Sequence, residues 1–350
     1  MLLATVMIYG NIHLYKRRKN INSTGLSSYI GACCAWMLYL FAVTEVLSLF
    51  HMVRFLSLFA VWGTLDGVLF IMLVLQWGKY LQEMGSGSET DGGRQKRSHW
   101  PGALRRMCGK GRQFFREAPY YGILLAIGAA VVCLAILTTP NNWDSMTYHL
   151  PRIVYWAQNR SVEHYATNSI RQISSPVLAE FINLHVYILC RGRDLFFNLL
   201  QAASYLTCAV MVGAIAGRLG CDRKFRFLAM LLYMSMPIAY AEALTTQVDN
   251  FATVWLLFFV YLLLDLAGQK EKIIFDRAAV CKVCMMGLCV AWGYLAKPSV
   301  CFGMVFFALW LLIVCIARKD RLWHLVRLAG CALPCVILPI LPELLLNFKT

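Results

Sequence analysis

Residues 299–316 read SVCFGMVFFALWLLIVCI, eighteen consecutive positions without a charged side chain. A helix needs about 20 mainly apolar residues to cross the hydrocarbon core of a bilayer, so this run predicts a transmembrane helix. Nine further apolar runs predict spans at roughly 1–15, 28–50, 55–78, 119–138, 195–216, 226–242, 250–266, 279–296 and 328–346. The chain is therefore expected to be an all-α polytopic membrane protein with about ten transmembrane helices.

The composition of the whole chain agrees with this class. Of the 350 residues, 59% are hydrophobic and only 15% are charged, whereas soluble domains carry about 25% charged residues. The formal net charge of +15 is explained by basic loops that face anionic lipid, so the bilayer is the expected partner and nucleic acid is not. The 14 cysteines are scattered, mostly inside apolar runs, without the spacing of a disulfide scaffold.

Basic residues are distributed unequally among the predicted loops. If the cluster Lys16–Lys19 lies in the cytoplasm, 25 of the 33 Lys and Arg residues fall on that side: four near residue 17, nine between 79 and 116, and four each near 223, 276 and 321. Such a bias is expected of cytoplasmic loops. This orientation puts the long loop 139–194, the turn at 247–250 and Lys297 together on the extracytoplasmic face, as a membrane-surface enzyme or a receptor requires.

The sequence divides into three parts. Residues 1–83 form N-terminal transmembrane helices, and the polar, basic stretch 84–118 has the composition of a flexible cytoplasmic linker. Residues 119–350 form the main transmembrane domain, which contains the loop 139–194.

Within that loop, Ser175-Pro176 can begin a helix. The segment from Val177 to Cys190 is too short to span a bilayer, and Glu180, Asn183 and His185 interrupt its apolar residues. We therefore expect an interfacial helix that lies on the bilayer.

The residues that could carry chemistry begin in the segment 142–152, which reads NWDSMTYHLPR. Asp144 is the candidate general base; an equally weighted alternative makes it the N-cap of the helix that follows. Arg152 could hold a phosphate, and Tyr148 and His149 could bind a sugar or an acceptor. Interfacial anchoring is the alternative for these three side chains.

Other charged residues lie at or within the predicted spans. Glu242 and Asp249 flank the turn before the seventh span, where they could position an acceptor or bind a cation; solvated carboxylates are the alternative. Lys297 could neutralise a lipid phosphate or extend to the headgroups. Glu45 and Asp66 fall within apolar runs, where charge is costly and a partner is expected.

Three of these motifs resemble those of a known family. The pattern Trp143-Asp144-x-x-Thr147-Tyr148-His149-Leu150-Pro151-Arg152 resembles the first-loop signature of bacterial GT-C glycosyltransferases, which are similar to the dolichyl-phosphate-mannose protein mannosyltransferases and the lipid A aminoarabinose transferases. Gln247-x-Asp249-Asn250 resembles their second extracytoplasmic motif, and Ala296-Lys297-Pro298 resembles a motif between later spans. The resemblance covers roughly residues 119–350.

The resemblance implies a GT-C-like bundle with interfacial helices in the first long extracytoplasmic loop. It also implies a sugar donor on polyprenyl phosphate and a base at Asp144. Many relatives carry a second acid where this chain has Ser145, which leaves a divalent metal possible and its ligands unknown. Relatives continue through further spans or a soluble domain, so we expect the chain to be truncated at its C-terminus.

The expected activity is that of a hexosyl- or pentosyltransferase that inverts the sugar. Asp144 would withdraw a proton from an acceptor hydroxyl on a glycan, lipid or protein, and that hydroxyl would attack the anomeric carbon. The departing phosphate would be stabilised by Arg152, Arg171 and Lys297. The expected acceptor- or sugar-binding residues are Tyr148, His149, Glu242, Gln247 and Asp249. The resemblance places the protein in the bacterial inner (plasma) membrane with its active site facing outward.

Two other functions remain open. A transporter or flippase for lipid-linked sugars would place its polar groups near the middle of the bilayer, and Glu45 and Asp66 favour it. A non-catalytic membrane scaffold would bind the donor without turnover.

Overall fold

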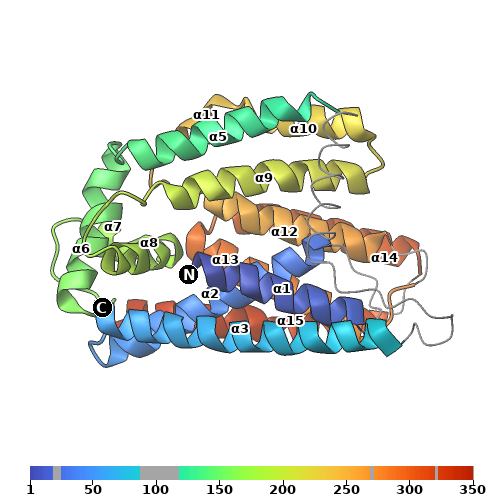
Figure 1. Cartoon of the computed structure of the whole chain (residues 1–350), viewed down its shortest axis with the longest axis horizontal. Coiled ribbons are helices and arrows are strands. Elements are labelled where there is room, and N and C mark those ends of the chain that lie inside the picture. Colours follow the sequence, from blue (N-terminus) through green and yellow to red (C-terminus); the bar gives the residue numbers. More distant parts are fainter. Residues whose placement is uncertain (19–24, 87–117, 269–271, 320–321, 350) are drawn as a thin grey trace.

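The computed structural model describes residues 1–18, 25–86, 118–268, 272–319 and 322–349, and all regular structure in these ranges is helical (Figure 1). The helices are α1 (Leu2–Arg18), α2 (Gly25–Leu49), α3 (Phe55–Ser86), α5 (Tyr121–Leu137), the π-helical turn η1 (Ser145–His149), α6 (Leu150–Asn159), α7 (Arg171–Ser174), α8 (Leu178–Leu189), α9 (Leu199–Arg218), α10 (Arg223–Met234), α11 (Pro237–Glu242), α12 (Asp249–Ala267), α13 (Arg277–Ala296), α14 (Val300–Ala317) and α15 (Leu322–Lys349).

Among the described residues, seven helices are long and apolar enough to cross a membrane: α2, α3, α9, α12, α13, α14 and α15. They support a multi-pass membrane protein. The spans predicted at 1–15 and 119–138 form α1 and α5, which have 17 residues each and are shorter than the seven. The total of ten transmembrane helices therefore stays a prediction.

The span predicted over 226–242 is not one continuous helix. Helix α10 ends at Met234, and α11 begins at Pro237 after an extended Met236. Proline has no N–H for the helical hydrogen-bond ladder, and its ring disfavours helical backbone at the preceding residue. The Tyr205 hydroxyl donates a hydrogen bond to the Met234 carbonyl at 2.5 Å, which satisfies the interrupted end.

The long helices run lengthwise, and their connections gather at two ends of the bundle (Figure 1). At the left end in Figure 1 lie α6, α7 and α8, which belong to the loop 139–194. A hydrogen bond between Gln247 and Asp144 joins this loop to the 242–249 turn. We call this left end the Asp144 end. At the opposite end lie the last turn of α1, with Lys16, Arg17 and Arg18, and the connection from α9 to α10. We call this the basic end.

Helix α8 is buried, in contrast to the interfacial helix that the sequence predicts. All eight residues from Leu178 to His185 are buried, and α2, α3, α6, α9 and α13 contact the helix. A helix lying on the bilayer would leave one face exposed. The predicted position in the chain is right within two residues, but the structure does not confirm an interfacial helix.

His185 shows how a polar side chain is accommodated in α8. Its Nδ1 accepts a hydrogen bond from Trp62 Nε1 at 3.1 Å. Its Nε2 therefore carries the hydrogen and donates to Thr44 Oγ1 at 2.9 Å, and the Thr44 hydroxyl donates to the Leu40 carbonyl. Burial, and next the positive N-terminus, lower the pKa of His185 to about 3, so the ring is neutral at physiological pH. This neutral chain of hydrogen bonds fixes α8 to α2 and α3.

The N-terminal helices belong to the same core as the rest of the bundle. The Phe41 ring of α2 lies 5.6 Å from the rings of Phe181 on α8 and Trp292 on α13. The predicted linker 84–118 falls almost entirely outside the described residues. The helices before it thus pack directly on those that carry the candidate site.

The two acids within apolar runs have neighbours in adjacent elements. The carboxylate of Glu45 on α2 interacts electrostatically with that of Glu343 on α15. Asp66 interacts in the same way with Tyr39 of α2. In the described part of the chain neither acid forms an ion pair with a basic side chain, so the partner that the sequence left unnamed is not identified.

Candidate functional site

The long loop enters its first helical turn through a cap that the sequence analysis did not identify. Asn142 Oδ1 accepts a hydrogen bond from the Ser145 backbone N–H at 2.8 Å, and asparagine is among the most favoured N-cap residues. The Asp144 side chain makes no capping hydrogen bond. Asp144 precedes the helical turn as the alternative interpretation expects, but its side chain does not act as the cap, and its carboxylate makes other contacts.

Those contacts bring three separate segments together. Asp144 Oδ2 accepts a hydrogen bond from Gln247 Nε2 at 3.0 Å, and Asp144 Oδ1 accepts one from Arg171 Nη1 at 3.3 Å. The Asp144 side chain stays 30% exposed and that of Arg171 63% exposed. The carboxylate is thus oriented from two sides while solvent, or a substrate, can still reach it.

A π-helical turn follows Asp144. The Leu150 N–H bonds to the Ser145 carbonyl five residues back, where an α-helix would use four. Pro151 cannot donate to the Thr147 carbonyl four residues before it. That carbonyl accepts a hydrogen bond from Gln172 Nε2 at 2.8 Å. Because Gln172 adjoins Arg171, this bond also holds α7, and with it the Arg171 guanidinium, beside Asp144.

Ser145 faces the interior, away from the partly exposed Asp144 carboxylate. Its Oγ accepts a hydrogen bond from Thr246 Oγ1 at 2.6 Å, and both side chains are buried. The bond joins the long loop to the turn before α12. The buried Ser145 side chain therefore fastens two segments of the chain together.

A buried ion cluster lies behind the turn. His149 Nδ1 is 2.5 Å from Glu180 Oε1, and Arg152 Nη1 is 3.7 Å from the same oxygen. Burial alone would raise the pKa of Glu180, but nearby Arg152 and then His149 outweigh burial and hold that pKa below its usual value. An ionised Glu180 thus compensates the buried cation of Arg152.

The surroundings of Arg152 change its predicted role. Its side chain is fully buried, and its guanidinium donates hydrogen bonds to the carbonyls of Arg171 at 2.9 Å and Pro176 at 3.1 Å. A group so enclosed cannot meet a lipid phosphate without unfolding the loop. Arg152 instead positions the backbone of Arg171. The predicted contact of His149 with a sugar is revised in the same way, since its ring is buried against Glu180.

Tyr148 lies at the edge of the open site. The Arg171 guanidinium carbon is 5.9 Å from the centre of its ring. Burial, and next the negative charge of Asp144, raise the pKa of Tyr148 to about 12. The phenol is therefore neutral at physiological pH and can donate a hydrogen bond.

A second polar group lies at the same end. Lys297 Nζ forms an ion pair with Asp249 Oδ1, and the two side chains are 40% and 37% exposed. Half-buried Glu242 is close enough to both to sense their charges. Burial and then Asp249 raise its pKa to about 7, while Lys297 opposes the rise. Glu242 therefore exchanges a proton near neutral pH.

Asn250 holds this second group in place. The buried side chain donates to the Ala239 carbonyl at 2.9 Å and accepts from the Tyr233 hydroxyl at 2.8 Å. It thereby ties the start of α12 to α10 and α11. Of the Gln247-x-Asp249-Asn250 motif, the first two residues face the site and the third supports them.

The carboxylates do not form a metal site. In the described part of the chain, no group of three or more His, Cys, Asp or Glu side chains is arranged to hold a metal ion. Asp144, Asp249 and Glu180 are instead paired with basic side chains. This donor set does not fit the divalent metal that the sequence left possible.

The structure therefore sorts the predicted residues into three groups. Asp144, Gln247, Arg171 and Tyr148 meet at the open site. Lys297, Asp249 and Glu242 form a neighbouring group, whereas His149 and Arg152 are buried. Asn142, Gln172 and Thr246 also support the site, but no distinctive local pattern predicts a role for them. Glu180 was predicted only as a polar interruption of an apolar segment, although an acid in such a segment was a signal for a buried ion pair.

Comparison of the chain with protein-family models, curated proteins and solved structures finds no match.

Proposed function

We propose that this protein is a membrane glycosyltransferase of the GT-C type, which transfers a sugar from a polyprenyl-phosphate donor to an acceptor hydroxyl with inversion. The observation that carries the proposal is the partly exposed carboxylate of Asp144, oriented by Gln247 and Arg171. The proposed setting is the bacterial inner membrane, with the Asp144 end facing outward.

In the proposed reaction, Asp144 accepts the proton of the acceptor hydroxyl. The hydroxyl oxygen then forms a bond to the anomeric carbon, on the face opposite the donor phosphate. The bond from that carbon to the phosphate oxygen breaks, and its electron pair leaves with polyprenyl phosphate. The hydrogen bond from Gln247 to Oδ2 holds the Asp144 carboxylate in one orientation. The other oxygen, Oδ1, can then exchange its contact with Arg171 for a hydrogen bond from the acceptor hydroxyl.

The leaving phosphate needs cations that solvent can reach. Arg171 and Lys297 meet this condition, since their side chains are 63% and 40% exposed. Preorganised cations at the site of developing charge are a large source of rate enhancement. Arg152 acts indirectly, because its hydrogen bond to the Arg171 carbonyl fixes the backbone that carries the Arg171 side chain.

Sugar and acceptor contacts are assigned to polar groups around this centre. Tyr148 remains a neutral donor, and the carboxylates of Asp249 and Glu242 can accept hydrogen bonds from hydroxyl groups. A glycan, a lipid or a protein hydroxyl would each meet this requirement.

The deciding experiment uses membranes that contain the wild-type chain or Asp144→Asn, incubated with a panel of polyprenyl-phosphate sugars. Asp194→Asn is the matched control, because Asp194 is an exposed acid of the same loop. Release of polyprenyl phosphate together with a glycosylated acceptor should be lost in Asp144→Asn and kept in the control. Equal release from both variants, or none from folded wild-type protein with any donor, would reject the proposal.

A transporter of lipid-linked sugars is the second candidate. It is favoured by the two acids Glu45 and Glu343, which interact between the predicted spans α2 and α15. Proteoliposomes with a fluorescent polyprenyl-phosphate sugar would test it. Movement of the donor between leaflets, lost in Glu45→Gln but kept in Asp144→Asn, would establish transport; binding of the donor without movement or turnover would indicate a scaffold.

A further inference from the structure

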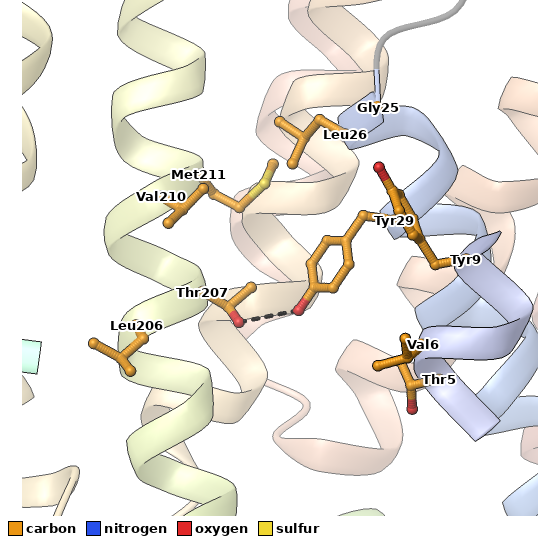
Figure 2. Close-up of a pocket in the computed structure, with 10 residues that line it drawn as sticks. All are labelled: Thr5, Val6, Tyr9, Gly25, Leu26, Tyr29, Leu206, Thr207, Val210 and Met211. Atoms are coloured by element: carbon orange, nitrogen blue, oxygen red, sulfur yellow. Dashed lines mark hydrogen bonds between the residues drawn. The ribbon is translucent and has the colours of Figure 1, made fainter. Parts of the chain in front are cut away.

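A cavity of about 500 Å³ lies between α1, α2 and α9 (Figure 2). Its volume falls within the roughly 300–1,000 Å³ of ordinary ligand sites. Figure 2 shows Tyr29 reaching across it to Thr207, and the two hydroxyl oxygens are 3.3 Å apart. The lining is otherwise mainly apolar and comprises Thr5, Val6, Tyr9, Gly25, Leu26, Leu206, Val210 and Met211.

The cavity opens on the outer surface of the bundle. Val6 and Val210 line it from opposite helices, and both are exposed. Helices α2 and α9 are candidate membrane spans, so this opening faces the lipid. An apolar cavity at such a place suits a hydrocarbon chain better than a sugar or a nucleotide.

A cluster of cations lies beyond the cavity at the basic end. Asp265 of α12 forms ion pairs with Arg218 of α9 and with Lys282 of α13. Lys16 of α1 interacts electrostatically with Asp265 and Lys282, and it donates a hydrogen bond to Ser27 Oγ. Two cations therefore pair with one carboxylate and a third interacts with it electrostatically, so the described residues of this cluster carry a surplus of positive charge.

Helix geometry connects the cluster to the cavity. Lys16 follows the lining residue Tyr9 by seven positions on α1, and Arg218 follows the lining residue Met211 by seven positions on α9. Seven residues are about two turns, or roughly 10 Å along a helix axis, and bring the side chain back to the same face. Both cations thus stand beyond the same end of the cavity.

We propose that the cavity and the cation cluster together bind an anionic phospholipid, with an acyl chain between α1, α2 and α9 and the phosphate near Lys16 and Arg218. The apolar lining matches the chain, and the surplus positive charge matches the headgroup. The site lies at the basic end, away from Asp144, and the inference does not depend on the proposed glycosyltransferase activity.

The test uses the purified full chain in neutral detergent, with retained lipid measured by native mass spectrometry. Wild-type protein should retain phosphatidylglycerol in preference to phosphatidylcholine. Lys16→Gln should weaken retention of phosphatidylglycerol about fivefold, because a basic residue near an anionic lipid surface contributes about 1 kcal/mol. Lys224→Gln, which removes an exposed cation of α10 outside the cluster, should have no effect.

The acyl-chain half of the site has its own matched pair. Val210→Trp should fill the cavity and reduce retention, whereas Val305→Trp adds the same bulk to an exposed position on α14 and should not. Both positions are exposed, so the fold should tolerate either change; equal unfolding temperatures would verify this. Equal retention of both lipids by wild-type protein, or matching results within either pair, would overturn the proposal. Complete displacement of the lipid by soluble glycerol phosphate would show an anion site without the acyl chain, and would also overturn it.

Discussion

Gln247 Nε2 donates a hydrogen bond to Asp144 Oδ2 at 3.0 Å, across 103 positions of the chain. The bond joins the long loop to the turn that begins α12. Thr246, the neighbour of Gln247, makes a parallel connection to Ser145, the neighbour of Asp144. Two adjacent pairs therefore fix the two segments relative to each other, one pair in the open site and one in the interior.

We expect Gln247→Met to lower the release of polyprenyl phosphate by roughly 10-fold or more, since a hydrogen bond to a charged group contributes about 1.5–3 kcal/mol. The effect should appear in kcat, because the lost bond orients the base. Gln247→Glu should be more harmful at neutral pH, because it places a like charge beside Asp144, and it should recover partly on acidification. Steady-state assays of both variants provide the measurement; full turnover by Gln247→Met would contradict it.

The buried Ser145–Thr246 pair predicts strong coupling between two substitutions. Ser145→Ala leaves the Thr246 hydroxyl without its acceptor, and Thr246→Val leaves Ser145 without its donor. Each should lower the free energy of unfolding by about 1–3 kcal/mol. The double variant removes both polar groups, so it should lower the free energy of unfolding by clearly less than the sum of the two single effects. Denaturant unfolding in detergent measures the cycle, and strictly additive effects would show that the hydrogen bond contributes little.

The long apolar helices could be predicted because their signal is local. The runs 250–266 and 299–316 correspond to α12 and α14 within a few residues, since length and hydropathy decide them without reference to neighbours. The run 226–242 forms two helices and not one, because Pro237 interrupts the backbone hydrogen-bond ladder, and an average over apolar residues does not register such a break. The sequence predicts an interfacial position for α8 because its polar residues have no partners nearby in the chain. In the structure, the partners of these residues come from distant elements.

The local sequence likewise predicts only part of the site, because the rest depends on contacts between segments that are far apart in the chain. The sequence indicates that Asp144 and Gln247 lie on one side of the membrane, but not that they touch. Nor does it separate Arg152 from Arg171: both are arginines near one motif, yet one is fully buried and the other largely exposed. Their difference comes from Glu180 and from the carbonyl of Pro176, which the folded loop brings to Arg152.

The Arg152–Glu180 pair predicts an asymmetry in stability. Arg152→Met leaves the Glu180 carboxylate buried with only His149 beside it and should cost about 3–5 kcal/mol, the range for removing one partner of a buried ion pair. The double variant Arg152→Met with Glu180→Leu removes both charges and should be more stable than Arg152→Met alone. Unfolding in detergent compares the two variants. A double variant less stable than the single one would show that these charges do not compensate each other.

Acidification should weaken the attachment of α8. The folded pKa of His185 is about 3, below its ordinary value of 6.5, so between these pH values the unfolded chain binds the extra proton. The contribution of His185 is therefore fully present above pH 6.5 and declines as the pH falls toward 3. We expect the unfolding temperature of the wild type to fall between pH 7 and pH 5 more steeply than that of His185→Gln, which cannot titrate. If the unfolding temperatures of the two proteins fall equally with pH, His185 is not buried as a neutral ring.

Glu242 predicts a pH dependence of opposite sign. Its folded pKa is raised to about 7, mainly by burial and then by Asp249, so the folded chain holds the extra proton between about pH 4.5 and pH 7. The contribution of Glu242 is therefore present below pH 4.5 and is lost as the pH rises through 7. The unfolding temperature of the wild type, relative to Glu242→Gln, should decline over this range and then stay level. Lys297→Met removes the cation that opposes the rise, so the decline should move to higher pH in that background. A difference between wild type and Glu242→Gln that does not change with pH would show that Glu242 keeps an ordinary acidity, and would remove it from the groups that exchange protons at the site.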